Sequence, residues 1–494
     1  MAKKLLTLEE SGLSRKERRA LQRIYSGALR EDEQQAKEEI EKLPVLSPMQ
    51  YRPGFWSFPI RRPWHRATGH QIAAANTFSA ADVHDAAGPI IGIDRNSGRP
   101  FTFDPYELYL LGLVASPNLL IQGSLRQGKS FFIKRLLALL VEFGRYAINT
   151  SDSKGEHGVV AEAIGGHVFK MGVFGSEIRL NPLEAPERRA GELERDYLAR
   201  VRAARVSVLQ QIASLLTPGG RALIAREMTI LEWALEEVEK TSGGRPTVRA
   251  VWETIASPAL LTAQDGYFQP TDANDLRDGL RRLVHGDLGG MFDMDSSIAL
   301  DPDSPYTVID TFAIGQRGDQ ALAVTQAVTN AWVFNTISNK QAHRQYLLIR
   351  EEGWADMRTR PALEAQLRQL KLSGEYGVLM VLIVHEGGDF DAVGPEGSQE
   401  RELAKSLLRG YANRISFWQN EETLDDAIAR KMFTKAEAAA IGGLSRGQFL
   451  VKMKSGSYVV DGNPTSTQWE KALFDTDKQM RERERELAEE MSAA

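Results

Sequence analysis

The residues best suited to chemistry lie in one glycine-rich run, Gly123-Ser-Leu-Arg-Gln-Gly128-Lys129-Ser130. Its spacing is typical of a phosphate-binding loop, whose backbone N–H groups turn toward phosphate oxygens. Glycine permits the tight turn, and a helix starting near Lys129 adds the positive end of its dipole. We expect Lys129 to reach the β- and γ-phosphates and Ser130 to bind Mg²⁺. The pattern predicts a site for ATP and Mg²⁺ formed by Gly123, Ser124, Leu125, Arg126, Gln127, Gly128, Lys129, Ser130 and Phe131.

A glycine loop without function is the alternative interpretation of this run. A functional loop needs an apolar strand before it and an apolar helix after it. The sequence offers both, with Asn118 to Gln122 as the strand and residues 129–143 as the helix. The context therefore favours a nucleotide site.

A nucleotide hydrolase of this kind also needs a carboxylate for the metal and a base that orients water. The apolar run Tyr346 to Arg350 is followed by Glu351 and Glu352, which would lie at the carboxyl edge of a parallel sheet beside the phosphates. We expect Glu351 to bind the metal and Glu352 to act as the base. The alternative is a pair of solvated loop residues. Asp310, after another apolar strand, is a rival carboxylate, for which capping of a turn is the expected role.

A third apolar strand, Val378 to Val384, ends in His385 and Glu386. In ATPases built on such a sheet, this position senses the γ-phosphate. A single histidine at a strand end is a weak signal, so a role without chemistry stays open.

The elements around these residues alternate between strands and helices, which predicts an α/β fold with a mainly parallel sheet. Residues 184–300 instead contain long helical stretches, which indicate an all-helical insertion. The predicted segments are a charged helical arm 1–45, a strap and small β region 46–110, a core 111–183, the insertion 184–300, a second core part 301–461 and a charged tail 462–494.

The composition sets limits on other classes of function. The formal net charge is −5, which does not suggest a general nucleic-acid coat, although the first 70 residues are locally basic. The chain has no cysteine, which excludes disulfides, thiolate metal sites and cysteine nucleophiles. No stretch is apolar enough for a transmembrane helix and no signal peptide opens the chain, so a cytoplasmic location is expected.

The order of the motifs resembles one family. After Gly123–Ser130 come Asp152-Ser-Lys-Gly-Glu156, Asn181-Pro-Leu183, the helical insertion, Met291-Phe-Asp293, and Glu351-Glu352. This order is similar to that of the conjugative-transfer ATPases of type IV secretion systems, of the VirB/TraC kind in the HerA/FtsK group. Actinobacterial members are the most similar, and Asp475-Thr-Asp477 fits them too.

The resemblance implies a RecA-like P-loop core and adds roles to several residues. Glu351 stands at the Walker B position, Glu352 at that of the catalytic acid, and His385 or Glu386 at the sensor position. Asp152 and Glu156 would lie near the nucleotide. An arginine from a neighbouring subunit usually completes such sites, for which Arg414 and Arg368 are the candidates.

The resemblance further implies a ring, expected to be a hexamer, at the inner face of the cell membrane. Its partners would be membrane-embedded channel proteins, with DNA as a candidate translocated substrate. The acid pair departs from the family's Asp-Glu, which puts full hydrolysis in doubt. Two alternatives stay open: a DNA-pumping translocase or coupling protein of the same group, and, because of Glu351, a nucleotide-binding structural subunit with weak hydrolysis.

Overall fold

The computed structural model describes most of the chain after residue 86. All described residues belong to the unit Ser79–Ala494, so the fold is that of this unit alone. The predicted arm 1–45 lies outside the described residues, and so do residues 46–86 of the predicted strap region. The described ranges are 87–173, 178–189, 191–262, 268–337, 344–350, 360–374, 377–384 and 398–475.

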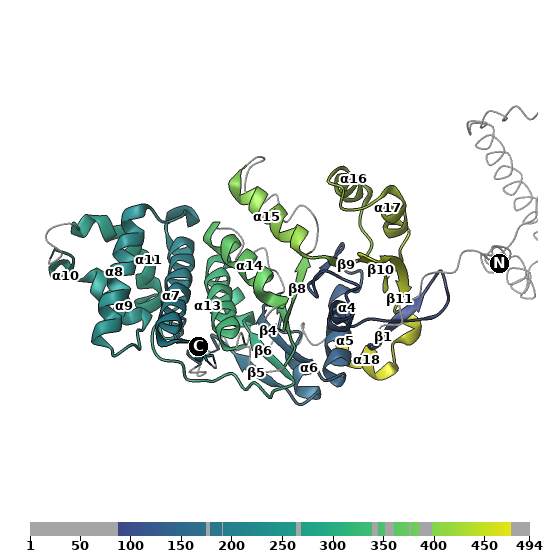
Figure 1. Ribbon diagram of the computed structural model, residues 1–494, viewed down its shortest axis with the longest axis horizontal. Coiled ribbons are helices and arrows are strands. Elements are labelled where there is room, and N and C mark those ends of the chain that lie inside the picture. The colour runs from purple at the N-terminus through teal and green to yellow at the C-terminus, as the bar shows by residue number, and fades with distance from the viewer. Residues whose placement is uncertain are drawn as a thin grey trace, which may run out of the picture. The chain divides into compact units, whose positions relative to one another are not determined.

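One eleven-stranded sheet runs through the described part of the chain, in the order β2-β1-β11-β10-β9-β3-β8-β7-β4-β6-β5 (Figure 1). The strands from β9 to β5 are parallel, whereas β10, β11, β1 and β2 pair antiparallel. The mainly parallel sheet predicted from the sequence is thus confirmed. The strands are β1 Ile90–Asp94, β2 Pro100–Thr102, β3 Leu119–Gln122, β4 Tyr146–Asp152, β5 His167–Lys170, β6 Tyr306–Asp310, β7 Tyr346–Arg350, β8 Val378–Val384, β9 Asn413–Ser416, β10 Gln448–Met453 and β11 Gly456–Asp461.

Helices cover both faces of the sheet, which explains why its central strands are continuously apolar. Every residue of β8 is buried. Neighbouring residues of β3 point to opposite faces, so Leu119 and Ile121 join one hydrophobic core and Leu120 the other. The core that contains Leu119 and Ile121 also includes residues of α4 Pro105–Leu110, α5 Lys129–Glu142, α6 Gly158–Ala163 and the end of α18 Gln468–Phe474. The core that contains Leu120 includes residues of α12 Phe312–Gly315, α13 Asp319–Ile337, α14 Arg360–Ser373 and α15 Gln399–Gly410.

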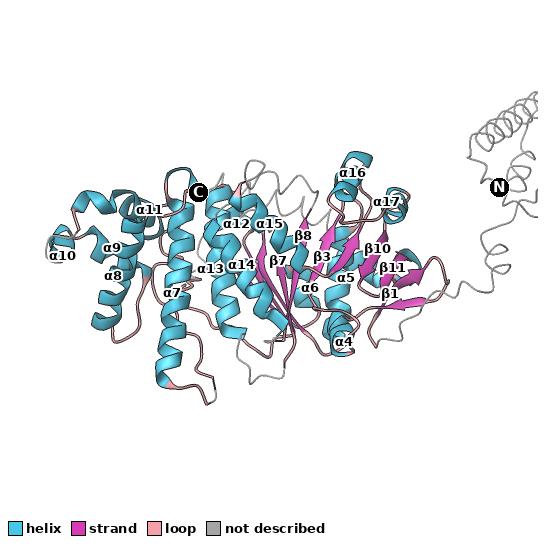
Figure 2. Cartoon of the chain, turned by 45° about the horizontal axis from the view of Figure 1, so that its top comes forward, coloured by secondary structure: helices cyan, strands magenta, loops and turns pink. Residues whose placement is uncertain are grey.

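The predicted helical insertion forms a bundle at one end of the unit, opposite β10, β11 and β1 (Figures 1 and 2). Its longest helix, α7, packs against α13 and α14, so its core continues that of one sheet face. The insertion contains α7 Glu194–Leu216, α8 Ala225–Thr241, α9 Val248–Ala256, α10 Pro258–Thr262 and α11 Asn274–His285, with short 3₁₀ turns at Pro218–Gly220 and Pro270–Ala273.

The last described part of the chain completes the far end of the sheet. Helices α16 Glu421–Ala429 and α17 Lys435–Gly442 form a small core with β10 around Phe433 and Ile441. After β11, a 3₁₀ turn at Asn463–Thr465 leads into α18, which packs on α5. Part of the predicted charged tail 462–494 therefore contacts the nucleotide-site helix, and β1 and β2 of the predicted entry region belong to the main sheet.

Candidate functional site

The predicted phosphate loop connects β3 to α5 at the carboxyl edge of the sheet. Gly128 is the N-cap of α5 and has a φ of 99°, a left-handed conformation that favours glycine. The loop is attached to its neighbours at both ends: the Ser124 N–H donates to the Trp418 carbonyl at 3.0 Å, and the Gly447 N–H donates to the Gln127 carbonyl at 3.2 Å. The loop is therefore positioned by segments far away in the sequence.

Gly123 must be small because β9 ends directly against it. A Cβ on Gly123 would lie 2.6 Å from the Cβ of Phe417, and the φ of Gly123 is +148°. The motif's first glycine thus allows close approach of two chain segments, while Gly128 supplies backbone conformation.

The side chain of Lys129 lies beneath the loop. Its Nζ donates to the carbonyl of Ser124 at 2.8 Å and to that of Gly123, and the residue is buried. The helix that follows presents its first N–H groups at the same place, where a helix attracts anions. The two features give the loop a positive interior.

The loop after β4 is fixed by Asp152. One carboxylate oxygen accepts the Glu156 N–H at 3.1 Å and the other accepts the His157 N–H at 2.8 Å. Glu156 in turn forms a buried ion pair with Lys134 of α5, at 2.8 Å. Asp152 thus positions the loop beside α5, whereas Lys154 and Glu156 reach the cavity above it.

These elements enclose a cavity of about 220 Å³ at the start of α5. Most of its charged lining is basic, which suits a polyphosphate. The lining includes six of the residues predicted from the motif and several that were not predicted. The residues are Leu125, Arg126, Gly128, Lys129, Ser130, Phe131, Lys134, Lys154, Glu156, Arg446, Phe474 and Asp475.

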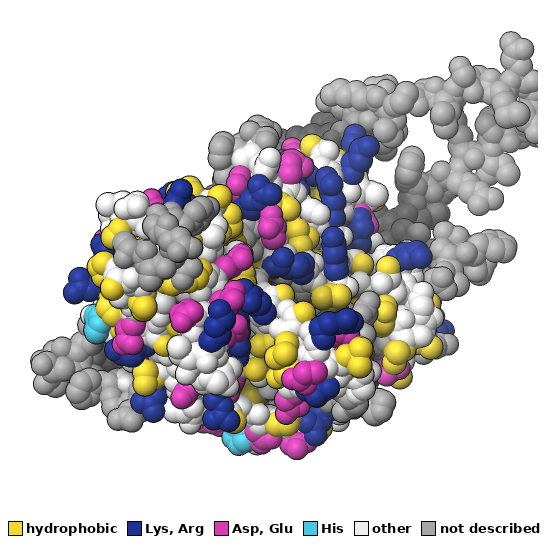
Figure 3. All heavy atoms as spheres, turned by 60° about the vertical axis from the view of Figure 1, so that its left-hand side comes forward, with side chains coloured by type: hydrophobic (Ala, Val, Ile, Leu, Met, Phe, Trp, Pro, Cys, Tyr) yellow, Lys and Arg dark blue, Asp and Glu magenta, His cyan; other side chains and the backbone are white. Residues whose placement is uncertain are grey.

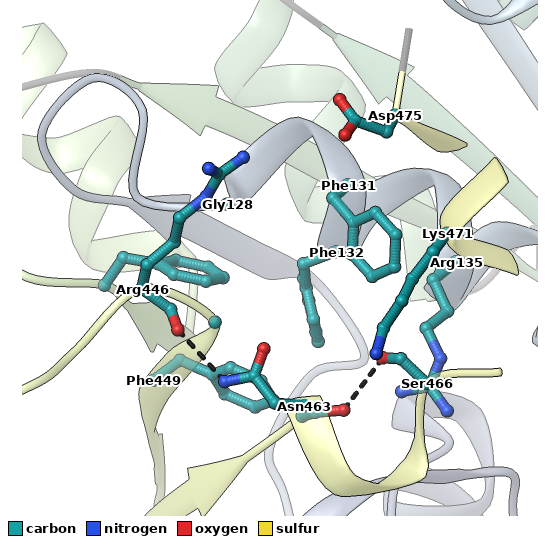
Figure 4. A pocket seen from close by; sticks show the side chains of 13 residues that line it. Gly128, Phe131, Phe132, Arg135, Arg446, Phe449, Asn463, Ser466, Lys471 and Asp475 are labelled. Carbon is teal, nitrogen blue, oxygen red and sulfur yellow. Dashed lines mark hydrogen bonds between the residues drawn. The ribbon is translucent and has the colours of Figure 1, made fainter. Parts of the chain in front are cut away.

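A second cavity, of about 330 Å³, adjoins the first and shares Gly128, Phe131, Arg446 and Asp475 with it (Figure 4). Sequence reasoning missed this cavity. Lys134 was within reach of such reasoning, since it lies one helical turn after Ser130, but no local signal marks Arg446. The turn that contains Arg446 is brought to the phosphate loop by the pairing of β9 with both β3 and β10.

Four predicted residues, Glu351, Glu352, His385 and Glu386, lie outside the described residues. The strands that precede them are described: Arg350 ends β7 and Val384 ends β8. Val384 is in register with Gln122, the last residue of β3 before the phosphate loop. The sheet therefore brings the ends of these strands to the same edge as the loop.

The remaining predicted residues lie away from both cavities. Asp310 accepts the Phe312 N–H at 3.0 Å, the turn capping expected of it. The Arg414 guanidinium donates to the Leu408 carbonyl at 3.3 Å, and burial lowers its pKa. Arg368 donates to Ser207 of α7 at 2.9 Å. The role of either arginine toward a neighbouring subunit stays a prediction.

Within the described ranges, no group of three His, Asp or Glu side chains is placed to hold a metal ion. Ser130 does line the basic cavity, and its hydroxyl is the kind of hard oxygen that Mg²⁺ accepts beside phosphate. None of the helices in those ranges has the length and apolar content that crossing a membrane requires.

Comparison with solved structures identifies the fold. VirB4 of Thermoanaerobacter pseudethanolicus superposes with a TM-score of 0.60 at 20% identity, over 78% of this chain and 99% of that one. The fold is that of VirB4. Two structures of the plasmid coupling protein TrwB are also similar, both at 14% identity. The complex with the ATP analogue ADPNP has a TM-score of 0.52 over 81% of this chain and 95% of TrwB. The complex with ADP and Mg²⁺ has 0.50 over 83% and 96%.

These likenesses confirm the P-loop fold with its helical insertion, which the phosphate loop, the alternation of elements and the helical stretches of residues 184–300 predicted. No protein-family model matches the sequence, and no curated protein matches it. The suggested similarity to actinobacterial members stays a prediction.

Proposed function

We propose that the protein binds and hydrolyses ATP and that this reaction drives a type IV secretion or conjugation apparatus. The observation that carries the proposal is the phosphate loop between β3 and α5, with Lys129 beneath it and a mainly basic cavity above it. The likeness of the fold to that of VirB4 supports this class of motor. TrwB, which has a similar fold, is known in complex with ADPNP and with ADP and Mg²⁺.

The residues divide the work at the cavity as follows. The N–H groups at the start of α5 bind phosphate oxygens, and Lys129 exchanges its loop carbonyls for the β- and γ-phosphates. Ser130 and Glu351 would hold Mg²⁺, which supplies charge neutralisation between the phosphates. Glu352 would orient the attacking water, with His385 at the γ-phosphate.

The assembled form is proposed from the sequence resemblance. The chain would form a ring, expected to be a hexamer, in the cytoplasm at the inner face of the membrane. Channel proteins embedded in that membrane would be its partners, and an arginine such as Arg414 would act across the subunit boundary.

A DNA translocase is the second candidate, because TrwB is a plasmid coupling protein by name. The segment Arg277 to Arg282 in the insertion contains three arginines that could contact DNA. In the structure, Arg277 pairs with Asp278 and Arg282 with Asp287. Figure 3 shows basic and acidic side chains interspersed over the face that comes forward. The two ion pairs of Arg277 and Arg282 neutralise much of the charge of this segment, which favours the secretion motor over DNA binding.

Steady-state ATP hydrolysis by the purified chain, with and without DNA, tests the proposal. Lys129→Ala should lower turnover about 100-fold or more, because it removes one preorganised contact to the transferring phosphate. Lys454→Ala, at an exposed turn of the β10–β11 hairpin, is the matched control and should leave turnover unchanged.

The outcomes separate the alternatives. Turnover that depends on Lys129 and ignores DNA supports the secretion motor, and several-fold stimulation by DNA supports the translocase. ATP binding without turnover supports a structural subunit. Equal turnover in wild type and Lys129→Ala would contradict the assigned phosphate site.

A further inference from the structure

The larger cavity beside the phosphate loop is built mainly from the C-terminal part of the described chain (Figure 4). Its apolar wall consists of Phe132, Phe417 and Phe449. The ring centroids of Phe132 and Phe449 lie 4.6 Å apart, and those of Phe417 and Phe449 lie 5.4 Å apart. These rings are at most 5% exposed, so they form a packed apolar floor on which a planar group would rest.

The opposite wall, residues 462–471, is fixed to α5 by Arg135. Its guanidinium donates to Glu470 at 2.9 Å, to the Thr465 carbonyl at 2.9 Å and to the Ile91 carbonyl at 2.9 Å. Arg135 and Glu470 are both buried. These hydrogen bonds therefore hold residues 462–471 in a fixed position beside α5.

Asn463 presents a fixed hydrogen-bond acceptor to this cavity. Its side-chain nitrogen donates to the Arg446 carbonyl at 3.0 Å and to the Asp461 carboxylate at 3.0 Å. Both partners accept only, so the amide cannot be flipped without placing oxygen against oxygen. The side-chain oxygen therefore faces away from them, into the cavity, as Figure 4 shows.

The absence of a side chain at Gly447 leaves room for the Asn463 amide. A Cβ on Gly447 would lie 2.4 Å from the side-chain oxygen of Asn463, and Gly447 has a φ of +82°. The same residue donates its N–H to Gln127 of the phosphate loop. Asn463 is thus connected to the phosphate site through a single turn.

We propose that this cavity holds the nucleobase and that Asn463 selects adenine by accepting a hydrogen bond from its exocyclic amino group. The proposal rests on the proposed function, because the phosphates must occupy the adjoining cavity. A base with an oxo group at the same position, such as guanine or hypoxanthine, sets an acceptor against the acceptor of Asn463. Asn463 is exposed, so the loss of this hydrogen bond costs about a factor of 3 to 10 in affinity.

Equilibrium binding of ATP, ITP and GTP to the full chain tests this inference. ATP and ITP share their phosphates and sugar, so the ratio of their dissociation constants reports on positions 6 and 1 of the purine, where ITP has an oxo group and an N1–H. Wild type should bind ATP about 3- to 10-fold more tightly than ITP. Asn463→Ala should bring that ratio close to one, mainly by weakening ATP.

Ser466→Ala is the matched control, because Ser466 lines the same wall and its hydroxyl donates to the Gly462 carbonyl at 2.8 Å. It should keep the ATP-to-ITP ratio. A mere loosening of the wall would weaken both nucleotides alike and leave the ratio unchanged.

The wild-type ratio is decisive even where a variant does not fold. Equal binding of ATP and ITP by wild type overturns the role of Asn463 while the proposed function stands. A ratio that survives Asn463→Ala also overturns it. Absence of binding by every triphosphate overturns both proposals.

Discussion

Gly123 is the residue of the phosphate loop whose replacement has the clearest physical consequence. A methyl group there meets Phe417 at 2.6 Å and has to be accommodated at a φ of +148°. Gly123→Ala should therefore lower the free energy of unfolding by about 2–4 kcal/mol, through overpacking and backbone strain. Urea denaturation measures this change, and ATP binding should weaken with it.

Gly144→Ala is the comparison that separates the two causes. Gly144 follows the other end of α5 with a φ of +84°, but nothing lies within 4 Å of its hypothetical Cβ. In Gly144→Ala only the backbone strain remains, so the free energy of unfolding should fall by about 1–2 kcal/mol. Equal losses at both glycines would show that close packing against Phe417 is unimportant.

The Lys134–Glu156 pair makes a second prediction at this scale. Both groups are buried, with side-chain exposures of 1% and 9%. Glu156→Gln should lower the free energy of unfolding by about 3–5 kcal/mol, because it removes the carboxylate charge that pairs with the buried ammonium of Lys134. The double variant Lys134→Met with Glu156→Gln should recover part of that loss, and a double-mutant cycle measures the coupling. Additive losses would contradict direct coupling.

Some residues of the candidate site could be predicted from the sequence and others could not. Lys129 and Ser130 were found because the phosphate loop is contiguous and its spacing reflects backbone geometry. Arg446 and Asn463 carry no such pattern. They reach the site only because β10 and β11 bring distant turns next to Gly128, and no local periodicity encodes that contact.

At the scale of elements, Glu437 connects α17 to the β10–β11 hairpin. Its carboxylate accepts from Lys452 at 2.8 Å, from Ser457 and from the Thr434 N–H. Burial alone would raise its pKa, but these hydrogen bonds outweigh burial and lower the pKa of Glu437 to about 2, from an ordinary 4.5. Its stabilising contribution is therefore complete above pH 4.5 and is lost as the pH falls toward 2.

Thermal unfolding across this pH range checks the prediction. Glu437→Gln should lower the melting temperature at neutral pH, and the difference from wild type should shrink as the pH falls below 4.5. Glu253→Gln, on an exposed turn of α9, is the control and should follow wild type throughout. A constant difference down to pH 2 would contradict the assignment.

The elements were predicted unevenly, for physical reasons. The buried strands β3, β7 and β8 are short apolar runs, and they were found within a residue or two of their observed bounds. The edge strand β5 was missed because only its middle residues are partly buried, so its pattern is weak. Helix α18 begins with a capping box between Thr467 and Glu470, a local signal that was present and not used.

At the scale of the whole described unit, the insertion and one face of the sheet share a core. Leu209 of α7 belongs to the same cluster as Leu120 of β3. Leu209→Ala should therefore cost about 2–5 kcal/mol and shift the unfolding of the nucleotide site with that of the insertion, in one transition. Leu198→Ala, 55% exposed on the same helix, is the control. Two separate transitions would contradict a shared core.

Assembly makes a further prediction at this scale, and it rests on the proposed ring. If subunits meet around bound ATP, light scattering should record a larger mass with ATP and Mg²⁺ than without nucleotide. Lys129→Ala should remain at the smaller mass under both conditions. A mass independent of nucleotide would contradict assembly driven by ATP.

The attachment of the phosphate loop to Trp418 and Gly447 has a consequence for the growing chain on the ribosome. The loop leaves the exit tunnel long before the segments that hold it, a delay on the order of tens of seconds at usual rates of translation. Until then Gly123 has no β9 to pack against, and the wall around Asn463 does not exist. A nascent chain therefore acquires both complete cavities only after residues as far as Asp475 have left the tunnel.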